Sequence, residues 1–262
     1  MRGTASASRS IRQPAARPLR RRSSAAIWTP AKPTSRRWRW RTTRGLPFAY
    51  IAPAELDSLK APTLACIVGD ANMTSGKDFN GKTMACNVPR GFGSLIMSAW
   101  IDNNGGDSKT VKWIGLPFPT LVASLQRGTI DGYIAPEPFI SAGMAGGGHI
   151  IMFEKGRLAP AFLQAGWFAT KDWIAKNATT AGALAAAIHD ANVWANANMH
   201  PRAEILSKYS TVPVNVIEAS RLPGQYGTQL DPALIQPVID AAAKYGYIAK
   251  RFPASDITAK LA

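Results

Sequence analysis

Cysteine is scarce in this chain, and long apolar runs are missing. The 262 residues include two cysteines, Cys66 and Cys86, which are too few for a disulfide framework and lack metal-type spacing. Each lies in an apolar, strand-like run, so we expect both thiols to be buried and unreactive, with a bridge or a reactive thiol as alternatives. No stretch of about 18 apolar residues occurs, and the sequence therefore predicts no transmembrane helix.

Acidic side chains are missing from the beginning of the chain. The first is Glu55, whereas the preceding 54 residues hold 13 of the 31 lysines and arginines. Positions 55–262 therefore carry 18 basic side chains, 31 less 13, against 16 acidic ones, although the whole chain has a formal charge of +15. A fold that binds nucleic acid carries its positive excess on the surface that meets the phosphates. The near-neutral body argues against that function and leaves a basic nucleic-acid-binding tail as the alternative.

Catalytic motifs are missing as well. The sequence contains no G-x-S-x-G elbow and no P-loop, and "GFGSLI" at 91–96 lacks the third glycine of a dinucleotide fingerprint. His149, His189 and His200 have no ligand-type spacing. We therefore expect no catalytic residue, no metal site and no cofactor.

What the chain does contain is an alternation of short apolar runs and helical patterns. Runs bounded by proline, glycine or aspartate predict strands, and apolar residues at helical spacing predict helices. Strands are expected at 46–53, 62–70, 81–88, 110–117, 129–136, 149–153 and 161–169, and helices within 89–106, where 103–105 form the stop, and at 119–128, 137–146, 171–176, 180–199, 201–209 and 231–245. Strands that alternate with helices of this length indicate an α/β protein with parallel sheets.

Several short motifs in this body occur together in one known family. They are "DFNGKTMA" at 78–85, "GFGS" at 91–94, "LPFPTLVASLQRGTID" at 116–131, "EPF" at 137–139, "GWFATKDW" at 166–173 and "LDPALIQPVIDAAAKYGYI" at 230–248. The combination resembles the periplasmic substrate-binding proteins of ABC importers of the nitrate, sulfonate and taurine type. The resemblance covers about residues 46–256.

The resemblance implies a two-lobed α/β fold in which each lobe is a mainly parallel sheet flanked by helices. Lobe two would be 81–166, and lobe one would combine 46–80 with 167–262, with crossings near Asn80 and Trp167; residues 1–45 form a separate basic segment. It also implies a periplasmic, monomeric protein that is not an enzyme and binds no nucleic acid. Its partners would be a small, anionic ligand and the membrane permease of an ABC importer. Thiamine-pyrimidine synthases share the fold, so an enzyme remains an alternative.

The turn at 87–94 is the strongest candidate for a ligand site. It leads a strand into the beginning of a helix, where free N–H groups and the helix dipole favour an anion. Glycines would let the backbone approach the ligand, while Arg90 and Ser94 would add a charge and a hydroxyl donor. The expected ligand-binding residues are Asn87, Arg90, Gly91, Phe92, Gly93, Ser94 and Glu137. The alternative is an ordinary turn with a solvated arginine.

Two further positions have two interpretations each. Glu137 either reaches the cleft or caps the next helix, because glutamate is favourable in a first turn. Trp167 and Phe168 would form an apolar wall near the crossing, although burial in the core is the commoner fate of such aromatic residues.

Residues 1–44 do not resemble the family. Arg20, Arg21 and Arg22 suggest an export signal, but no apolar segment of about 7–15 residues follows them, so the chain as written has none. When "SSAAIWTPAKPTSRRWRWRTT" at 23–43 is read from the third base of each codon, the same bases permit "LVGGDLDAGEADVASLALAHN", which resembles the family. We therefore expect a frame-shifted segment that leaves lobe one incomplete; the alternative is a genuine basic tail. Sequencing the DNA around codons 1–45 would decide between them.

Overall fold

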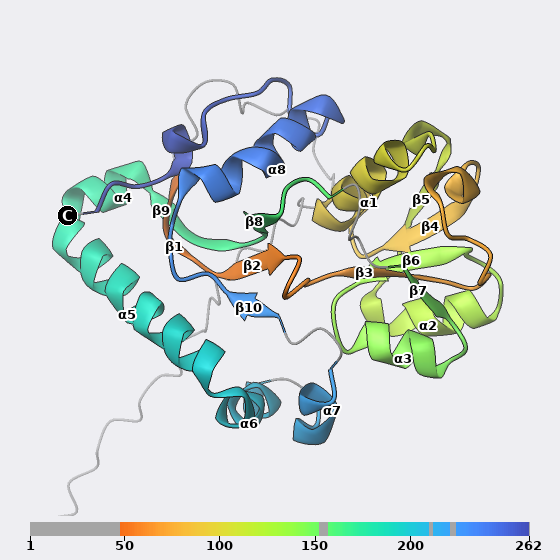
Figure 1. Ribbon diagram of the computed structural model, residues 1–262. Coiled ribbons are helices and arrows are strands. Elements are labelled where there is room, and N and C mark those ends of the chain that lie inside the picture. Colours follow the sequence, from red (N-terminus) through yellow and green to blue (C-terminus); the bar gives the residue numbers. More distant parts are fainter. Residues whose placement is uncertain (1–47, 152–156, 210–211, 221–223, 262) are drawn as a thin grey trace, which may run out of the picture.

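The computed structural model describes residues 48–151, 157–209, 212–220 and 224–261 (Figure 1). The expected basic or frame-shifted segment lies outside the described residues. Within them, helices flank β-sheets, and the expected α/β class is confirmed.

The elements follow one another along the chain in the expected alternation. The strands are β1 (Phe48–Pro53), β2 (Glu55–Ser58), β3 (Ala65–Val68), β4 (Thr83–Cys86), β5 (Lys112–Gly115), β6 (Gly132–Ala135), β7 (His149–Ile151), β8 (Ala161–Leu163), β9 (Gly166–Thr170) and β10 (Gln225–Tyr226). The helices are α1 (Phe92–Asn103), α2 (Phe118–Gln126), α3 (Phe139–Ala145), α4 (Lys171–Lys176), α5 (Ala178–Ala197), α6 (Met199–Tyr209), α7 (Val214–Glu218) and α8 (Pro232–Lys244).

Five strands form the larger sheet, in the order β5-β4-β6-β3-β7. β4 runs parallel to β5 and β6, as the sequence predicts. β3 runs antiparallel to both β6 and β7. The expectation of parallel pairing is therefore wrong for β3. The chain enters the larger sheet through β3, and this strand runs opposite to its neighbours β6 and β7.

Both faces of the larger sheet are covered by helices. Strand side chains alternate between the faces, so Cys66 and Val68 pack toward α1, while Ala65 and Ile67 pack toward α2 and α3. The helical residues that complete these two cores are Ile96, Met97, Trp100 and Ile101 from α1 and Leu121, Leu125 and Ile140 from α2 and α3. Burial on both faces explains why β3 and β6 read as continuous apolar runs.

The smaller sheet has the order β10-β2-β8, and all its pairs are antiparallel. On one face, Leu56 and Leu163 pack with Ile235 and Ile239 of α8. β1 and β9 form a separate antiparallel ribbon. The sequence predicts a single strand at 161–169, and this is wrong, because the chain leaves β8 for the ribbon between 163 and 166.

Strand pairing shows where the chain passes between the two sheets. It leaves the smaller sheet between β2 and β3 and returns between β7 and β8. β3 therefore lies in the larger sheet and β8 in the smaller one, which differs from a division at Asn80 and Trp167. The lobe boundaries themselves stay a prediction.

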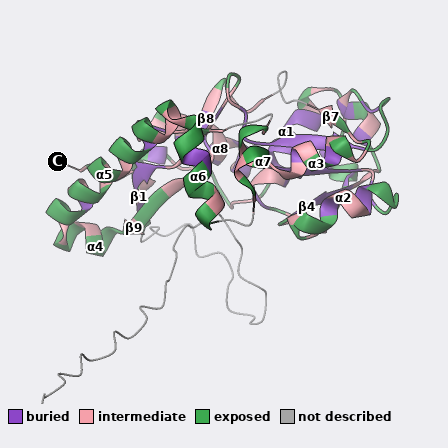
Figure 2. Cartoon of the chain, turned by 90° about the horizontal axis from the view of Figure 1, so that it is seen from below, coloured by how far each residue is buried: buried purple, intermediate pink, exposed green. Residues whose placement is uncertain are grey.

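Burial differs strongly between the two halves. Buried residues concentrate around the larger sheet, whereas the outer helices α5 and α6 are mostly exposed (Figure 2). In the 20-residue helix α5, only Ala181 and Asn192 are buried. None of the helices that the structure describes has the combination of length and hydropathy that a membrane span needs.

Candidate functional site

The turn after β4 leads into α1 and holds most of the residues predicted to bind a ligand. A Cβ atom on Gly91 would lie 2.8 Å from the carbonyl oxygen of Val88, so the entry into the helix requires glycine. A Cβ atom on Gly93 would lie 3.0 Å from a methyl group of Ile134 in β6. The two glycines therefore let the first turn of α1 lie close to the sheet.

The first turn of α1 presents free backbone N–H groups. The first hydrogen bond of the helix runs from the N–H of Leu95 to the carbonyl of Gly91, at 3.1 Å. The N–H groups of Phe92, Gly93 and Ser94 precede this bond and have no acceptor within the helix. Together with the positive end of the helix dipole, they can bind an anion.

Arg90 has an unusual backbone and a definite partner. Its φ of 66° is left-handed, a conformation that costs a non-glycine residue about 1–2 kcal/mol. The guanidinium group donates to the carbonyl oxygen of Gly246 and lies over the ring of Tyr247, with 5.1 Å between Cζ and the ring centroid. Gly246 and Tyr247 follow α8, so Arg90 reaches from the larger-sheet side of the molecule to the smaller-sheet side.

Ser94 is fully buried and bonds in two directions. Its hydroxyl group donates to the carbonyl oxygen of Gly91 at 3.0 Å, and its oxygen lies 2.8 Å from the hydroxyl oxygen of Tyr247. A serine hydroxyl has one hydrogen, so the tyrosine is the donor in the second bond. Burial is the main cause that raises the pKa of Tyr247.

The other predicted site residues lie apart from this bonded group. Asn87 is exposed, and the ring of Phe92 packs against Phe162 of β8 at a centroid distance of 6.0 Å. Glu137 accepts hydrogen bonds from the backbone N–H and the hydroxyl of Ser141, at 3.0 and 2.9 Å. The geometry of Glu137 thus favours the capping interpretation.

Trp167 and Phe168 are not core residues. They are 41% and 39% exposed on β9, so the expectation that burial is their commoner fate is wrong here. Phe168 packs edge to face against Phe48, with 5.4 Å between the ring centroids. Both rings belong to the β1–β9 ribbon, which lies outside the helix-covered larger sheet.

A buried polar cluster at the two crossings was not recognised from the sequence. Asp57 on β2 pairs with Arg157 and accepts hydrogen bonds from the N–H and hydroxyl groups of Thr63, at 2.9 and 2.7 Å. Gln164 contacts the Thr63 hydroxyl and donates to Glu55 at 2.9 Å. Burial raises the pKa of Glu55 to about 7. Because Thr63 precedes β3 and Arg157 precedes β8, the cluster ties both crossings to β2.

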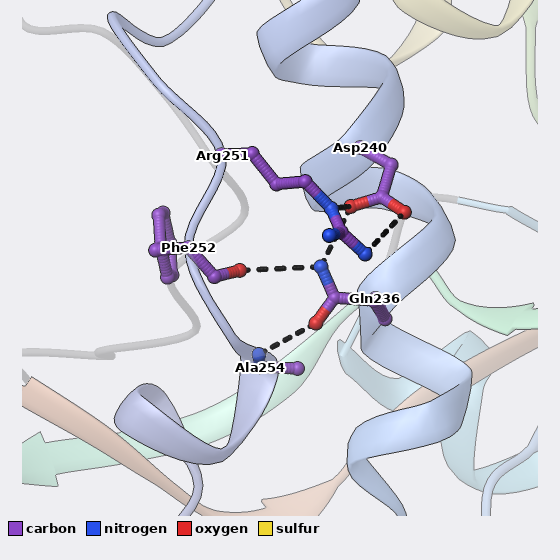
Figure 3. Close-up of polar contacts among 5 residues, drawn as sticks. All are labelled: Gln236, Asp240, Arg251, Phe252 and Ala254. Atoms are coloured by element: carbon purple, nitrogen blue, oxygen red, sulfur yellow. Dashed lines mark hydrogen bonds and ion pairs between the residues drawn. The ribbon is translucent and has the colours of Figure 1, made fainter.

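The segment that follows α8 is held in place by a second polar cluster. Asp240 accepts hydrogen bonds from Arg251 and from Gln236 (Figure 3). Gln236 also donates to the carbonyl of Phe252 and accepts from the N–H of Ala254. These hydrogen bonds hold residues 251–254 against α8.

The two cysteines are buried in the core, and His200 lies at the surface beside two carboxylates. Both thiols are buried, as predicted, and burial is the main cause that raises the pKa of Cys86 to about 12. His200 contacts the carboxylates of Glu204 and Glu218 at the surface. Across the described parts of the chain, no group of three or more His, Cys, Asp or Glu residues is arranged to hold a metal ion.

Comparisons with known proteins agree with this architecture. The structure is similar to the periplasmic aliphatic sulphonate binding protein SsuA from Escherichia coli, with a TM-score of 0.62 and 16% identity over 82% of this chain and 70% of that one. The periplasmic nitrate-binding protein NrtA from Synechocystis PCC 6803 gives a TM-score of 0.59 and 15% identity over 80% and 63%. The desulfurization enzyme DSZB gives 0.58 and 11% over 82% and 78%.

A search of curated proteins by sequence found no match. A family model described as the NMT1-like family matches residues 57–208, which is more than half of the chain. The chain therefore belongs to the NMT1-like family and has the two-lobed α/β fold of periplasmic substrate-binding proteins of the sulphonate and nitrate type.

Proposed function

We propose that this protein is the solute-binding component of an ABC importer and captures a small anion between its two lobes. The fold that it shares with sulphonate- and nitrate-binding proteins carries this proposal. The anion would resemble nitrate, a sulfonate or taurine. The protein would act as a periplasmic monomer that delivers its ligand to a membrane permease, without binding nucleic acid.

Strand pairing supports a revised division into lobes. We assign about 64–151 to the lobe built on the larger sheet, and the remaining described residues to the lobe built on the smaller sheet. The described connections at 59–63 and 157–160 are then the hinge. Asp57 on β2 pairs with Arg157 of one connection and accepts hydrogen bonds from Thr63 of the other.

The beginning of α1 is the part of the site for which the physical argument is strongest. The N–H groups of Phe92, Gly93 and Ser94 supply anion donors, and the ring of Phe92, which is only partly buried, supplies an apolar surface beside them. A ligand with a negative head and a short apolar body matches these two features. It would favour the closed arrangement through its higher affinity for that state.

Calorimetry on the full chain tests this function. The panel is nitrate, taurine, short alkanesulfonates and pyrimidine precursors, with a neutral alcohol of matched size as the control. We expect saturable binding of an anion. Arg90→Ala should weaken that binding about tenfold to a hundredfold, because a charged hydrogen bond contributes roughly 1.5–3 kcal/mol. Equal affinity for the alcohol and the anion would contradict the proposal.

The likeness to DSZB gives a second candidate, an enzyme on the same fold. The two cysteines argue against a thiolate nucleophile, since both are buried and burial raises the pKa of each thiol. Prolonged incubation with the best-bound anion, followed by mass spectrometry, tests this candidate. Recovery of the unchanged ligand supports the binding protein, and conversion to a product supports the enzyme.

A further inference from the structure

We infer that Tyr247 is a positioning residue of the ligand site, because it clasps the turn before α1 to the opposite lobe and holds the two lobes in the closed arrangement. We call Arg90, Ser94, Gly246 and Tyr247 the cross-lobe clasp. The consequence for ligand binding rests on the proposed function, whereas the clasp itself rests on contacts alone.

The sequence at the end of α8 sets the position of Tyr247. Gly246 adopts a left-handed φ of 68° directly after the helix, and its N–H bonds to the carbonyl of Ala243 at 3.2 Å. The N–H of Tyr247 bonds to the carbonyl of Ala242 at 2.7 Å. This pair of bonds is the Schellman arrangement that ends many helices at glycine. Tyr247 is therefore held by the cap of α8.

The chain is fixed a second time just beyond this cap. Arg251 bonds to Asp240, and Gln236 bonds to the backbone of Phe252 and Ala254 (Figure 3). Both partners, Gln236 and Asp240, are on α8 itself. Tyr247 thus lies between the cap of α8 and a segment that is hydrogen-bonded to α8. Its backbone position is therefore fixed relative to this helix, and a contact made by its side chain couples α8 to the opposite lobe.

Three contacts connect the end of α8 to the turn before α1. Tyr247 donates to Ser94, its ring lies under the guanidinium group of Arg90, and Gly246 accepts from Arg90. Leu95 of α1 packs beside them against Ala241 and Ala242 of α8. The strained backbone of Arg90 is consistent with this role, since strain persists where surrounding contacts determine a conformation.

The contacts of the clasp also show which hydrogen-bond donors near the turn remain available to a ligand. The hydroxyl of Ser94 bonds to Gly91 in its own turn and to Tyr247 of the opposite lobe, and one N–H of Arg90 bonds to Gly246. The N–H groups of α1 and the remaining N–H groups of Arg90 are the donors left for an anion. Loss of the Tyr247 hydroxyl should therefore lower ligand affinity by opening the lobes rather than by removing a ligand contact.

Distances between spin labels on the two lobes test the clasp in the full chain. Lys109 on the larger-sheet side and Lys208 on α6 are exposed, and replacing each with cysteine allows labelling while Cys66 and Cys86 stay buried. We expect Tyr247→Phe to lower the ratio of closed to open molecules about fivefold, the effect of one neutral hydrogen bond. Tyr247→Ala, which also removes the ring, should lower it further.

Two further sets of variants show whether the opening depends on the hydrogen bond between Tyr247 and Ser94. Ser94→Ala should match Tyr247→Phe, and the double variant should open no further than either one. Tyr226→Phe is the matched control, because Tyr226 lies on β10 of the same lobe with Arg202 over its ring at 5.6 Å. If the distances between the two spin labels in Tyr247→Phe and Tyr247→Ala equal those in the parent protein, the clasp is overturned. Additive opening in the double variant overturns the pairing of Tyr247 with Ser94.

Calorimetry with taurine and nitrate separates this inference from the proposed function. Lobe opening in Tyr247→Phe without binding of either anion by the parent supports the clasp and contradicts that ligand class. Anion binding by the parent with unchanged distances in the Tyr247 variants supports the function and overturns the clasp.

Discussion

The two sheets of this protein differ in how their strands and cores are assembled. The larger sheet is built from one continuous stretch, 65–151, and helices from the same stretch cover both of its faces. The smaller sheet takes β2, β8 and β10 from three distant parts of the chain and is packed on one face by α8. Local contacts therefore complete the first unit, whereas the second depends on contacts between distant segments.

The two halves also differ in what they bury. The core of the larger sheet is almost entirely apolar, with Tyr133, Met84 and Met97 fully buried. The smaller sheet buries Asp57 against Arg157 and partly buries Glu55. Buried charges are costly unless they are paired and hydrogen-bonded. The larger sheet is therefore stabilised by apolar packing, whereas the smaller sheet also depends on a buried ion pair.

A matched pair of leucine substitutions gives the largest expected effect. Leu121 on α2 is fully buried, so Leu121→Ala should lower the free energy of unfolding by about 2–5 kcal/mol. Leu184 on α5 is 44% exposed, and Leu184→Ala should change it by less than about 0.5 kcal/mol. Urea denaturation measures both. Equal losses would mean that α5 is covered in solution and would remove the contrast between the halves.

The sequence predicts the larger sheet well because its signals are local. Apolar runs bounded by glycine and proline mark β3, β4 and β6, and helical spacing marks α1 and α2. β2 was missed because "ELDS" alternates polar and apolar residues without an apolar run. β8 and β9 read as one strand because nothing local shows that the chain changes partners at 164–165.

Protonation of Glu55 tests the polar character of the smaller sheet. Burial raises the pKa of this carboxyl group from 4.5 to about 7, so the folded state binds the proton more tightly than the unfolded state. The free energy of unfolding should therefore fall as the pH rises from about 4.5 to about 7, by up to about 3 kcal/mol at 1.36 kcal/mol per pKa unit. Thermal unfolding across this range measures the fall.

Glu55→Gln is the matched variant, because its amide oxygen can still accept from Gln164. The variant should lose this part of the pH dependence and be more stable than the parent at pH 8. The difference between parent and variant isolates Glu55 from other groups that titrate in the same range. Parallel curves for the two proteins would show that the carboxyl group is solvated and that the smaller sheet buries less charge than its geometry indicates.

The turn that leads into α1 could be predicted from the sequence, but its tertiary contacts could not. The glycines and the strand-to-helix turn indicated the beginning of α1. The left-handed backbone of Arg90 has no local signal, because arginine rarely adopts it. Tyr247 is 153 residues away from Ser94, so their hydrogen bond arises only from tertiary packing. The "KYGYI" text at 244–248 does signal a helix cap, and this was the clue to Tyr247 that the sequence offered.

Gly246→Ala gives the smallest expected effect and tests whether the two halves communicate through the cap of α8. A Cβ atom at this position would meet no neighbour within 4 Å, so the cost is that of the left-handed backbone, about 1 kcal/mol in the free energy of unfolding. Gly128→Ala on the larger-sheet side is the control, since Gly128 has the same φ of 68° and equally open surroundings. Both variants should lose similar stability in urea denaturation, but only Gly246→Ala should lengthen the distance between labels on the two lobes. If both leave that distance unchanged, the α8 cap supports its own helix and does not position the opposite lobe.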